Sequence, residues 1–447
     1  MGRLLRWNDF RARPHSRSVR YRQVNPPVGA ASRHRSGCQE LDSPAPAGCP
    51  AAPNALWLYI IYLDNNATTQ PSPNVCTAVA DALTTHWENP SSVHRAGQAV
   101  RRRLELAREH VARLLCVKSR EVIFTSGGTE SVDLAIRGTL DTFSGTPTLI
   151  TTRVEHAAVR DLAEAFEKSG RCTVVWLPLH TDAARQGVVD IDATRSVIEE
   201  VKGPALLSVQ WANNETGVIQ PIEQLHALCS PRGIVVHCDA TQWVGKMPLI
   251  ADGPFDLLTC SPHKFHGPKG VGVLVAKRGV RMRPTLHGTQ ELGRRGGTEN
   301  VPGIIGAGEA ADEAIVFVAD AAQRDALRTL RDEFEHLILA GIPDAVINGP
   351  RAPSLRLWNT SNIGFPQLEA EALLLLLSER GVCASAGAAC SSGSLEPSPV
   401  LLAMGIEPRI AHGSLRFSLS KHTTRDEVHD AARILTECVA RLQQSMP

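Results

Sequence analysis

The chain has 447 residues, of which 43% are apolar and 21% charged, and its formal net charge is +1. This near-neutral balance argues against nucleic acid or an anionic membrane as a partner, and an aromatic content of 4% argues against a base-stacking surface. No stretch reaches the ~18 to 20 apolar residues of a membrane span. The eleven cysteines contain no CxxC pair, which fits reduced thiols in a cytoplasmic protein.

Residues 1–59 differ in composition from the rest of the chain. They carry nine arginines, seven prolines and three acidic residues. Such a segment fits an organelle-targeting leader, a disordered tail or an over-extended translation start, and its prolines interrupt any amphipathic helix. We assign no chemistry to it, and we expect a cytoplasmic protein while leaving an organelle leader open.

From residue 60 onward, apolar strand-like segments alternate with helical ones such as 157–169 and 221–229. Strands are expected at 121–125, 148–152, 172–177, 205–211, 233–239, 255–260 and 272–276. Strands that are apolar on both faces predict a mostly parallel sheet covered by helices, an α/β fold. Ligands of such sheets bind beyond the carboxyl ends of the strands.

The pattern changes after residue 320, where short strand-like pieces stand between helices. Strands are expected at 346–348 and 362–365, and helices at 321–339, 369–380 and 425–444. We therefore predict a large domain over 76–319 and a smaller α+β domain over 320–447, with segment 60–75 joining the small domain.

Lys264 and Asp239 each follow or end an apolar strand-like run. A lysine amine can form a Schiff base with the aldehyde of pyridoxal phosphate, and a carboxylate can keep the pyridine nitrogen protonated. Each residue alone is weak evidence, because most lysines are surface charges and aspartates often end strands.

Three further segments follow predicted strands. Gly128 and Thr129 open a helix, where backbone N–H groups suit a phosphate, although an ordinary helix cap is the alternative. His156 offers a flat ring for stacking on a pyridine, with a capping or core histidine as the alternative. Asn214 offers an amide to the cofactor, with a turn before Gly217 as the alternative.

Two late residues indicate the reaction and the substrate. Cys390 lies in a run of very small residues, 384–394, where a thiol is poorly placed for core packing and well placed on a loop that visits a reaction centre. Arg416 interrupts an apolar strand and needs an anion, either the carboxylate of an amino acid or a structural ion-pair partner.

Together these motifs resemble the class-V, fold-type-I pyridoxal phosphate family, specifically cysteine desulfurases of the NifS and IscS kind. The matching segments occur in family order: 62–69, 125–130, 155–156, 213–217, 239–242, 263–270, 295–300 and 385–394. The resemblance implies a large domain with a mostly parallel seven-stranded sheet and a smaller α+β domain.

The resemblance also implies roles around the cofactor ring. Lys264 holds pyridoxal 5′-phosphate and then acts as the base, Asp239 pairs with the pyridine nitrogen, and His156 stacks on the ring. Gln242 and Asn214 bond the ring and the substrate region.

At the cofactor phosphate, the resemblance implies contacts from five residues. They are Gly128, Thr129, Ser261 and His263, together with Thr298 from the second subunit of a homodimer.

For the reaction, the resemblance implies that Arg416 clamps the carboxylate of L-cysteine and that Cys390 takes the sulfur as a persulfide, leaving L-alanine. Cys390 then passes the sulfur to an acceptor, such as an iron–sulfur scaffold protein, and is also a candidate transient ligand of an iron–sulfur cluster.

The chain departs from the family pattern at two positions. Pro262 has no backbone N–H, so it removes one phosphate contact, and Asp133 stands where an asparagine is common. Rival interpretations are a selenocysteine lyase, a non-catalytic sulfur-assembly scaffold and a plain aminotransferase. The scaffold should lack Lys264 or Cys390, and the aminotransferase has no use for the Cys390 loop.

Overall fold

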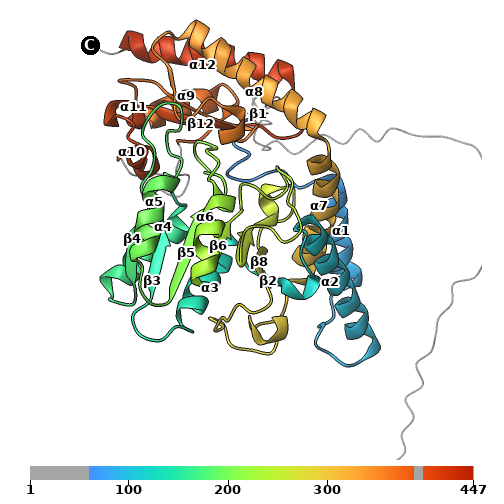
Figure 1. Cartoon of the computed structure of the whole chain (residues 1–447). Helices are drawn as coiled ribbons and strands as arrows, with labels where there is room; N and C mark the ends of the chain where they lie inside the picture. The colour runs from blue at the N-terminus through green and yellow to red at the C-terminus, as the bar shows by residue number, and fades with distance from the viewer. Residues whose placement is uncertain (1–59, 387–395, 446–447) are drawn as a thin grey trace, which may run out of the picture. The chain divides into compact units, whose positions relative to one another are not determined.

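The computed structural model describes residues 60–386 and 396–445. In this part of the chain seven strands form one sheet, in the order β2-β8-β7-β6-β5-β3-β4 (Figure 1). Their bounds are β2 Val122–Thr125, β3 Thr148–Thr151, β4 Thr173–Trp176, β5 Ala205–Gln210, β6 Val235–Asp239, β7 Leu257–Cys260 and β8 Gly272–Ala276. Each strand falls inside a predicted segment, so the predicted α/β sheet is confirmed.

The sheet is mostly parallel, with β8 running antiparallel to both of its neighbours, β2 and β7. The chain passes directly from β7 to β8 through residues 261–271, without the crossover helix that a parallel pair requires. Lys264 lies on this connection, in a single 3₁₀ turn, Pro262–Lys264. The sharp return of the chain therefore places the lysine at the carboxyl end of β7.

Helices cover the sheet because its strands bury both faces. In β5, Leu206 belongs to one apolar cluster, while Leu207 and Val209 belong to another on the opposite face. The covering helices are α1 Pro73–Thr85, α2 Arg95–Leu114, α3 Gly128–Leu140, α4 Ala157–Lys168, α5 Ile191–Glu200, α6 Ile222–Cys229 and α7 Val301–Ala319. Figure 1 shows α1, α2 and α7 side by side near the β2 edge of the sheet, and α7 packs on both of the others.

The C-terminal region has its own small sheet, in the antiparallel order β12-β10-β9. Its elements are α8 Ala321–Gly341, β9 Val346–Ile347, β10 Thr360–Gly364, α9 Ala370–Glu379, β11 Val382–Cys383, α10 Pro399–Ala403, α11 Pro408–His412, β12 Ser414–Ser418 and α12 Arg425–Ser445. The helices predicted at 321–339, 369–380 and 425–444 correspond to α8, α9 and α12. They pack together above the large sheet in Figure 1.

The start of the described chain joins this C-terminal region. Strand β1, Ile61–Tyr62, pairs in parallel with β11, and Ile61 and Leu63 share an apolar cluster with Phe334 and Phe417. The described residues, 60–386 and 396–445, belong to one compact unit, so the boundaries at 75/76 and 319/320 stay predictions. Across the described ranges, none of the helices combines the length and apolar character needed to span a bilayer.

Candidate active site

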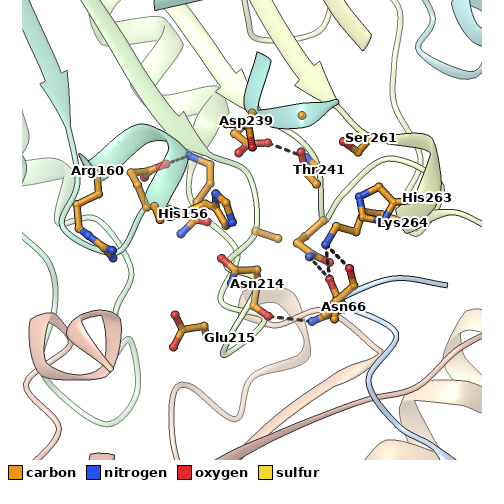
Figure 2. A pocket seen from close by; sticks show the side chains of 18 of the residues that line it. Asn66, His156, Arg160, Asn214, Glu215, Asp239, Thr241, Ser261, His263 and Lys264 are labelled. Atoms are coloured by element: carbon orange, nitrogen blue, oxygen red, sulfur yellow. Dashed lines mark hydrogen bonds between the residues drawn. The ribbon is translucent and has the colours of Figure 1, made fainter. Parts of the chain in front are cut away.

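A cavity of about 300 Å³ opens where the parallel strands end. It is lined by all the predicted ring, phosphate and substrate residues except Thr298, namely Gly128, Thr129, His156, Asn214, Asp239, Gln242, Ser261, His263, Lys264 and Arg416. In Figure 2, Asp239, His156 and Lys264 face the cavity from three directions, and Asn214 and Glu215 lie opposite Asp239. Among these predicted residues, the fold brings together Gly128 and Arg416, which are 288 positions apart in the sequence.

The Lys264 amine points across the cavity toward the N-terminal segment (Figure 2). Its Nζ donates hydrogen bonds to the carbonyl oxygens of Asn66 at 2.7 Å and Ala67 at 2.8 Å. Both carbonyl oxygens accept from the N–H groups of this amine. The next residue, Phe265, is buried against the large-sheet core and so fixes the position of the Lys264 backbone.

Asp239 is the last residue of β6, and it is only 7% exposed. Its Oδ1 accepts a hydrogen bond from the backbone N–H of Thr241 at 3.0 Å. A fully buried acid, Glu155, lies close enough for the two charges to interact. Burial, and then the charge of Asp239, raises the pKa of Glu155 to about 8, against hydrogen bonds from Thr152 and Gln210 that lower it. Glu155 is therefore protonated at neutral pH.

His156 lines the cavity and also caps α4, so the capping alternative and the cavity position hold together. Its Nδ1 accepts from the backbone N–H of Ala158 at 3.1 Å, which leaves the ring proton on Nε2. Burial lowers the pKa of His156, and the nearby Lys264 lowers it further, against a rise from Asp239. The imidazole is consequently neutral where it lines the cavity.

One end of the cavity is suited to an anion. Helix α3 begins at Gly128, where backbone N–H groups have no partner within the helix. A Cβ on Gly128 would lie 2.7 Å from Oγ of Ser261, so glycine lets the helix start approach that hydroxyl. Burial, and then Lys264, lowers the pKa of His263 to about 4, so a neutral ring faces the same end. Pro262 begins the 3₁₀ turn, a position where a missing N–H costs no helical hydrogen bond.

The wall of the cavity that the Lys264 amine contacts is held by hydrogen bonds around Asn66. We call Asn66, Gln242, Lys246, Asn359 and Thr360 the Asn66 cluster; all five are buried. The Asn66 side chain donates to Thr360 Oγ1 at 2.9 Å and accepts from Asn359 Nδ2 at 3.0 Å and Lys246 Nζ at 2.7 Å. Its backbone oxygen accepts from Gln242 Nε2 at 3.0 Å, besides the bond from Lys264.

Arg416 is buried at the centre of β12 and already has an anionic partner. Its Nη2 lies 2.6 Å from Oδ1 of Asp64, and its Nη1 donates to the backbone oxygen of Asn214 at 3.1 Å. The structure therefore contains the ion pair that was the alternative interpretation of Arg416, and the substrate clamp stays a prediction. Because Arg416 also lines the cavity, the two roles are compatible.

Several cavity residues were not singled out from the sequence. Glu155, Arg160, Glu215 and Thr241 all line the cavity, and Glu215 is buried with its Oε2 accepting from Ser398 at 2.6 Å. Burial raises the pKa of Glu215, against the Ser398 bond and the charges of Arg416 and Arg160. Glu155, Arg160 and Glu215 each lie one to four positions from His156 or Asn214 in the sequence. This proximity to a predicted site residue was the signal that could have identified them.

Three predicted features remain outside this cavity. Thr298 is exposed and does not line it, so its phosphate contact from a second subunit stays a prediction. Cys390 lies outside the described residues. In the parts of the chain that the structure describes, no group of three or more metal-ligating side chains could hold a metal ion. Asp133 pairs with Arg137 on the surface of α3 through Oδ1 at 2.7 Å, away from the cavity.

Residues 61–430 match the model of the aminotransferase class-V family. The chain is 44% identical over 390 residues to a protein from Nostoc named cysteine desulfurase, and the aligned residues cover 87% of this chain and 95% of that protein. It is 43% identical over 390 residues to the cysteine desulfurase NifS of Azotobacter vinelandii, with 87% of this chain and 94% of that protein covered. A solved NifS-like protein superposes with a TM-score of 0.78 at 33% identity, over 86% of this chain and all of the other.

Proposed function

The chain belongs to the class-V aminotransferase family, and we propose from that membership that it is a pyridoxal phosphate-dependent cysteine desulfurase. The net reaction converts L-cysteine and a protein thiol into L-alanine and a persulfide. Atoms and electrons balance without an external oxidant, because the C–S bond broken in the substrate is replaced by a C–H bond while the thiol S–H is replaced by S–S. The observation that carries this proposal is the meeting of Lys264, Asp239 and His156 in one cavity.

The residues of the cavity fit pyridoxal phosphate. Oδ1 of Asn214 is buried and has no hydrogen-bond partner within the protein, which is the state of a group that awaits a ligand. The close approach of Gly128 to Ser261 leaves no room for a Cβ and presents N–H groups with a hydroxyl at the anion end. Bound there, the cofactor supplies an electron sink that makes the α-hydrogen of an amino acid acidic.

The side chains of this protein then have distinct tasks. Asp239 presents a carboxylate to the pyridine nitrogen, while neutral His156 covers the face of the ring. The N–H groups of Gly128 and Thr129, with Ser261 and His263, hold the phosphate. The Lys264 amine takes and returns the substrate proton.

Arg416 would bind the carboxylate of the substrate by exchanging part of its contact with Asp64. Arg416 lines the cavity, and its guanidinium carries five N–H donors. A carboxylate that enters the cavity can therefore share the same arginine. Arg416→Lys should raise KM for L-cysteine by about tenfold, because lysine cannot reproduce bidentate binding.

Cys390 is the proposed sulfur acceptor, and the ends of its segment support this. Ser385 exchanges backbone hydrogen bonds with Arg416 at 2.7 and 3.2 Å, and Ser398 donates to Glu215 at 2.6 Å. Both Arg416 and Glu215 line the cavity. Cys390 is five positions beyond Ser385, and five residues can span up to ~17 Å. From there Cys390 would pass sulfur to an acceptor protein, such as an iron–sulfur scaffold.

A homodimer is proposed from the exposed apolar side chains near one groove. The groove has a volume of about 590 Å³ and is bordered by Pro90 and Leu292. Leu292 is 74% exposed, and Trp87 and Val93, close to Pro90 in the chain, are 73% and 94% exposed. Apolar side chains at such exposure are suited to burial by a second copy of the chain, which would also bring Thr298 to the partner's cavity.

The test is to incubate the purified protein with L-cysteine, or separately with L-selenocysteine, and to measure alanine with sulfide or selenide. The wild type should form alanine from cysteine, and Cys390→Ala should lose nearly all of that turnover. The matched control is Cys76→Ala, which removes an exposed thiol on α1 and should leave turnover unchanged. Unchanged turnover in Cys390→Ala would exclude the persulfide route. Preference for selenocysteine, with turnover that survives loss of Cys390, would identify a selenocysteine lyase.

A further inference from the structure

Lys246 is a fully buried lysine to which the proposed reaction assigns no task. A lysine is almost never buried without partners that repay its desolvation. Burial, followed by the charges of Lys264 and Arg416, holds the pKa of Lys246 well below its usual value. A lysine kept in this position, one hydrogen bond away from the residues that line the cavity, needs an explanation.

Its contacts form a closed ring of hydrogen bonds. The Lys246 Nζ donates to Asn66 Oδ1 at 2.7 Å and to Oε1 of Gln242. The other end of the Gln242 amide, Nε2, donates to the backbone oxygen of Asn66 at 3.0 Å. A neutral amine still has two N–H groups, so these two bonds persist whether or not Lys246 carries its charge.

The backbone of Lys246 is held as firmly as its side chain. The preceding Gly245 has φ +75°, and a Cβ there would lie 2.3 Å from Cβ of Phe265, the residue after Lys264. On the other side, Trp358 Nε1 donates to the Lys246 backbone oxygen at 3.0 Å. The turn that carries Lys246 is thus wedged between the Lys264 segment and the C-terminal region.

This ring determines which way the Gln242 amide points. With its oxygen against the Lys246 amine and its nitrogen against the Asn66 carbonyl, both contacts pair a donor with an acceptor. Turning the amide over would place its oxygen against the Asn66 carbonyl oxygen, two acceptors facing each other. The donor that Gln242 has left for a ligand in the cavity is therefore its second Nε2–H.

We propose that Lys246 is a positioning residue, which fixes the amide of Gln242 so that its second Nε2–H donates to the phenolic oxygen of bound pyridoxal phosphate. The proposal rests on the proposed function, because Gln242 lines the cavity assigned to that cofactor. Lys246 itself touches neither cofactor nor substrate. It acts through Gln242, and a side chain that cannot donate at this position should release the amide.

The experiment is a double-mutant cycle on cofactor affinity. Apoproteins of the wild type, Lys246→Met, Gln242→Leu and the double variant are titrated with pyridoxal phosphate, and binding is followed by the visible absorbance of the protein-bound cofactor. Each single substitution should weaken binding by about tenfold, the effect of one hydrogen bond to a charged or strongly polar group. The double variant should bind no more weakly than Gln242→Leu alone, because both changes remove the same contact.

A matched control separates this effect from the general loss of a buried lysine. Lys277 is half-buried, donates to the backbone oxygen of Gly253 at 2.7 Å, stacks over Phe255 and does not line the cavity. Lys277→Met should leave the affinity for the cofactor unchanged and combine additively with Gln242→Leu. If Lys246→Met does not fold, Lys246→Leu, whose side chain likewise has no N–H donor, is carried through the same cycle with the same criterion.

Unchanged affinity in the Lys246 variant, or losses that add in the double variant, would overturn the positioning role. A wild-type protein that binds no pyridoxal phosphate would instead overturn the proposed function itself. The two failures are therefore distinguishable in one series of titrations.

Discussion

Two walls of the cavity are built by different means. The sheet wall consists of His156, Asp239 and Lys264, each placed by the end of a different strand or the start of the helix that follows it. The opposite wall includes Asn66 and Gln242 of the Asn66 cluster, and within this cluster Asn66 bonds to residues 176 to 294 positions away. In the sheet wall, the backbone geometry of strands and helix starts positions the side chains. In the opposite wall, hydrogen bonds between the side chains position them. Substitutions should consequently separate into losses of chemistry on the sheet wall and losses of stability in the Asn66 cluster.

The largest effect is expected from Lys264→Ala on the sheet wall. Loss of the amine removes the proton-transferring group and should lower the rate of alanine formation by about 10³-fold or more. The free energy of unfolding should change by less than about 1 kcal/mol, because Lys264 lines a cavity and is only partly buried. Lys168→Ala, at an exposed position near the end of α4, is the control and should match the wild type. A variant that keeps turnover, or that unfolds, would remove the contrast between the walls.

Asn66→Ala probes the other wall. Its removal deletes one buried hydrogen bond each from Lys246, Asn359 and Thr360, and should lower the free energy of unfolding by about 2 to 4 kcal/mol. Urea unfolding measures this loss. Asn74→Ala, which removes an exposed bond to Glu313, should change stability by less than about 0.5 kcal/mol. Equal effects of the two substitutions would mean that the Asn66 cluster does not hold its wall.

Glu155→Gln sharpens the comparison through pH. Because burial raises the pKa of folded Glu155 to about 8 from 4.5, the folded state keeps a proton between these pH values that the unfolded state loses. Stability from this group therefore falls as pH rises through the window, by up to about 1.4 kcal/mol per pH unit. Relative to the wild type, Glu155→Gln should gain about 1 to 2 kcal/mol between pH 6 and pH 7.5 in urea unfolding. Parallel pH profiles for the two proteins would contradict a protonated Glu155.

The smallest effect is expected from Asp133→Asn. This residue departs from the family pattern, but its carboxylate pairs with Arg137 one helical turn away on a partly exposed surface. Loss of the pair should cost about 0.3 to 0.5 kcal/mol and leave the rate of alanine formation unchanged. A fall in that rate would give Asp133 a place in the site that its position on α3 does not suggest.

The sheet and the sheet wall could be predicted because both depend on local sequence. The predicted strands 148–152, 233–239 and 255–260 were recognised from their apolar residues, and His156, Asp239 and Lys264 follow or end them. The antiparallel direction of β8 was not predicted, since a strand's apolar pattern is the same in either direction.

The Asn66 cluster could not be predicted from any one segment. Asn66 lies in a motif that the resemblance matched, yet its partners Asn359 and Thr360 are 293 and 294 positions away. Buried Lys246 looks like any other lysine in the sequence, because burial is a property of the packed chain. The Asp64 partner of Arg416 was foreseen only as an unspecified anion, for the same reason.

The pairing of β1 with β11 also has a consequence for synthesis. Residues 61–66 emerge from the ribosome early, but they find their hydrogen-bond partners at 360, 382–383 and 418 only near the end of translation. Contacts of such sequence separation form late and slowly. While residues 277 to 360 are being synthesised, the nascent chain has a complete large sheet but no finished wall opposite the lysine. Cofactor binding therefore waits for the last part of the chain. A polypeptide whose synthesis stops early carries Lys264 but lacks the wall that would hold the cofactor beside it.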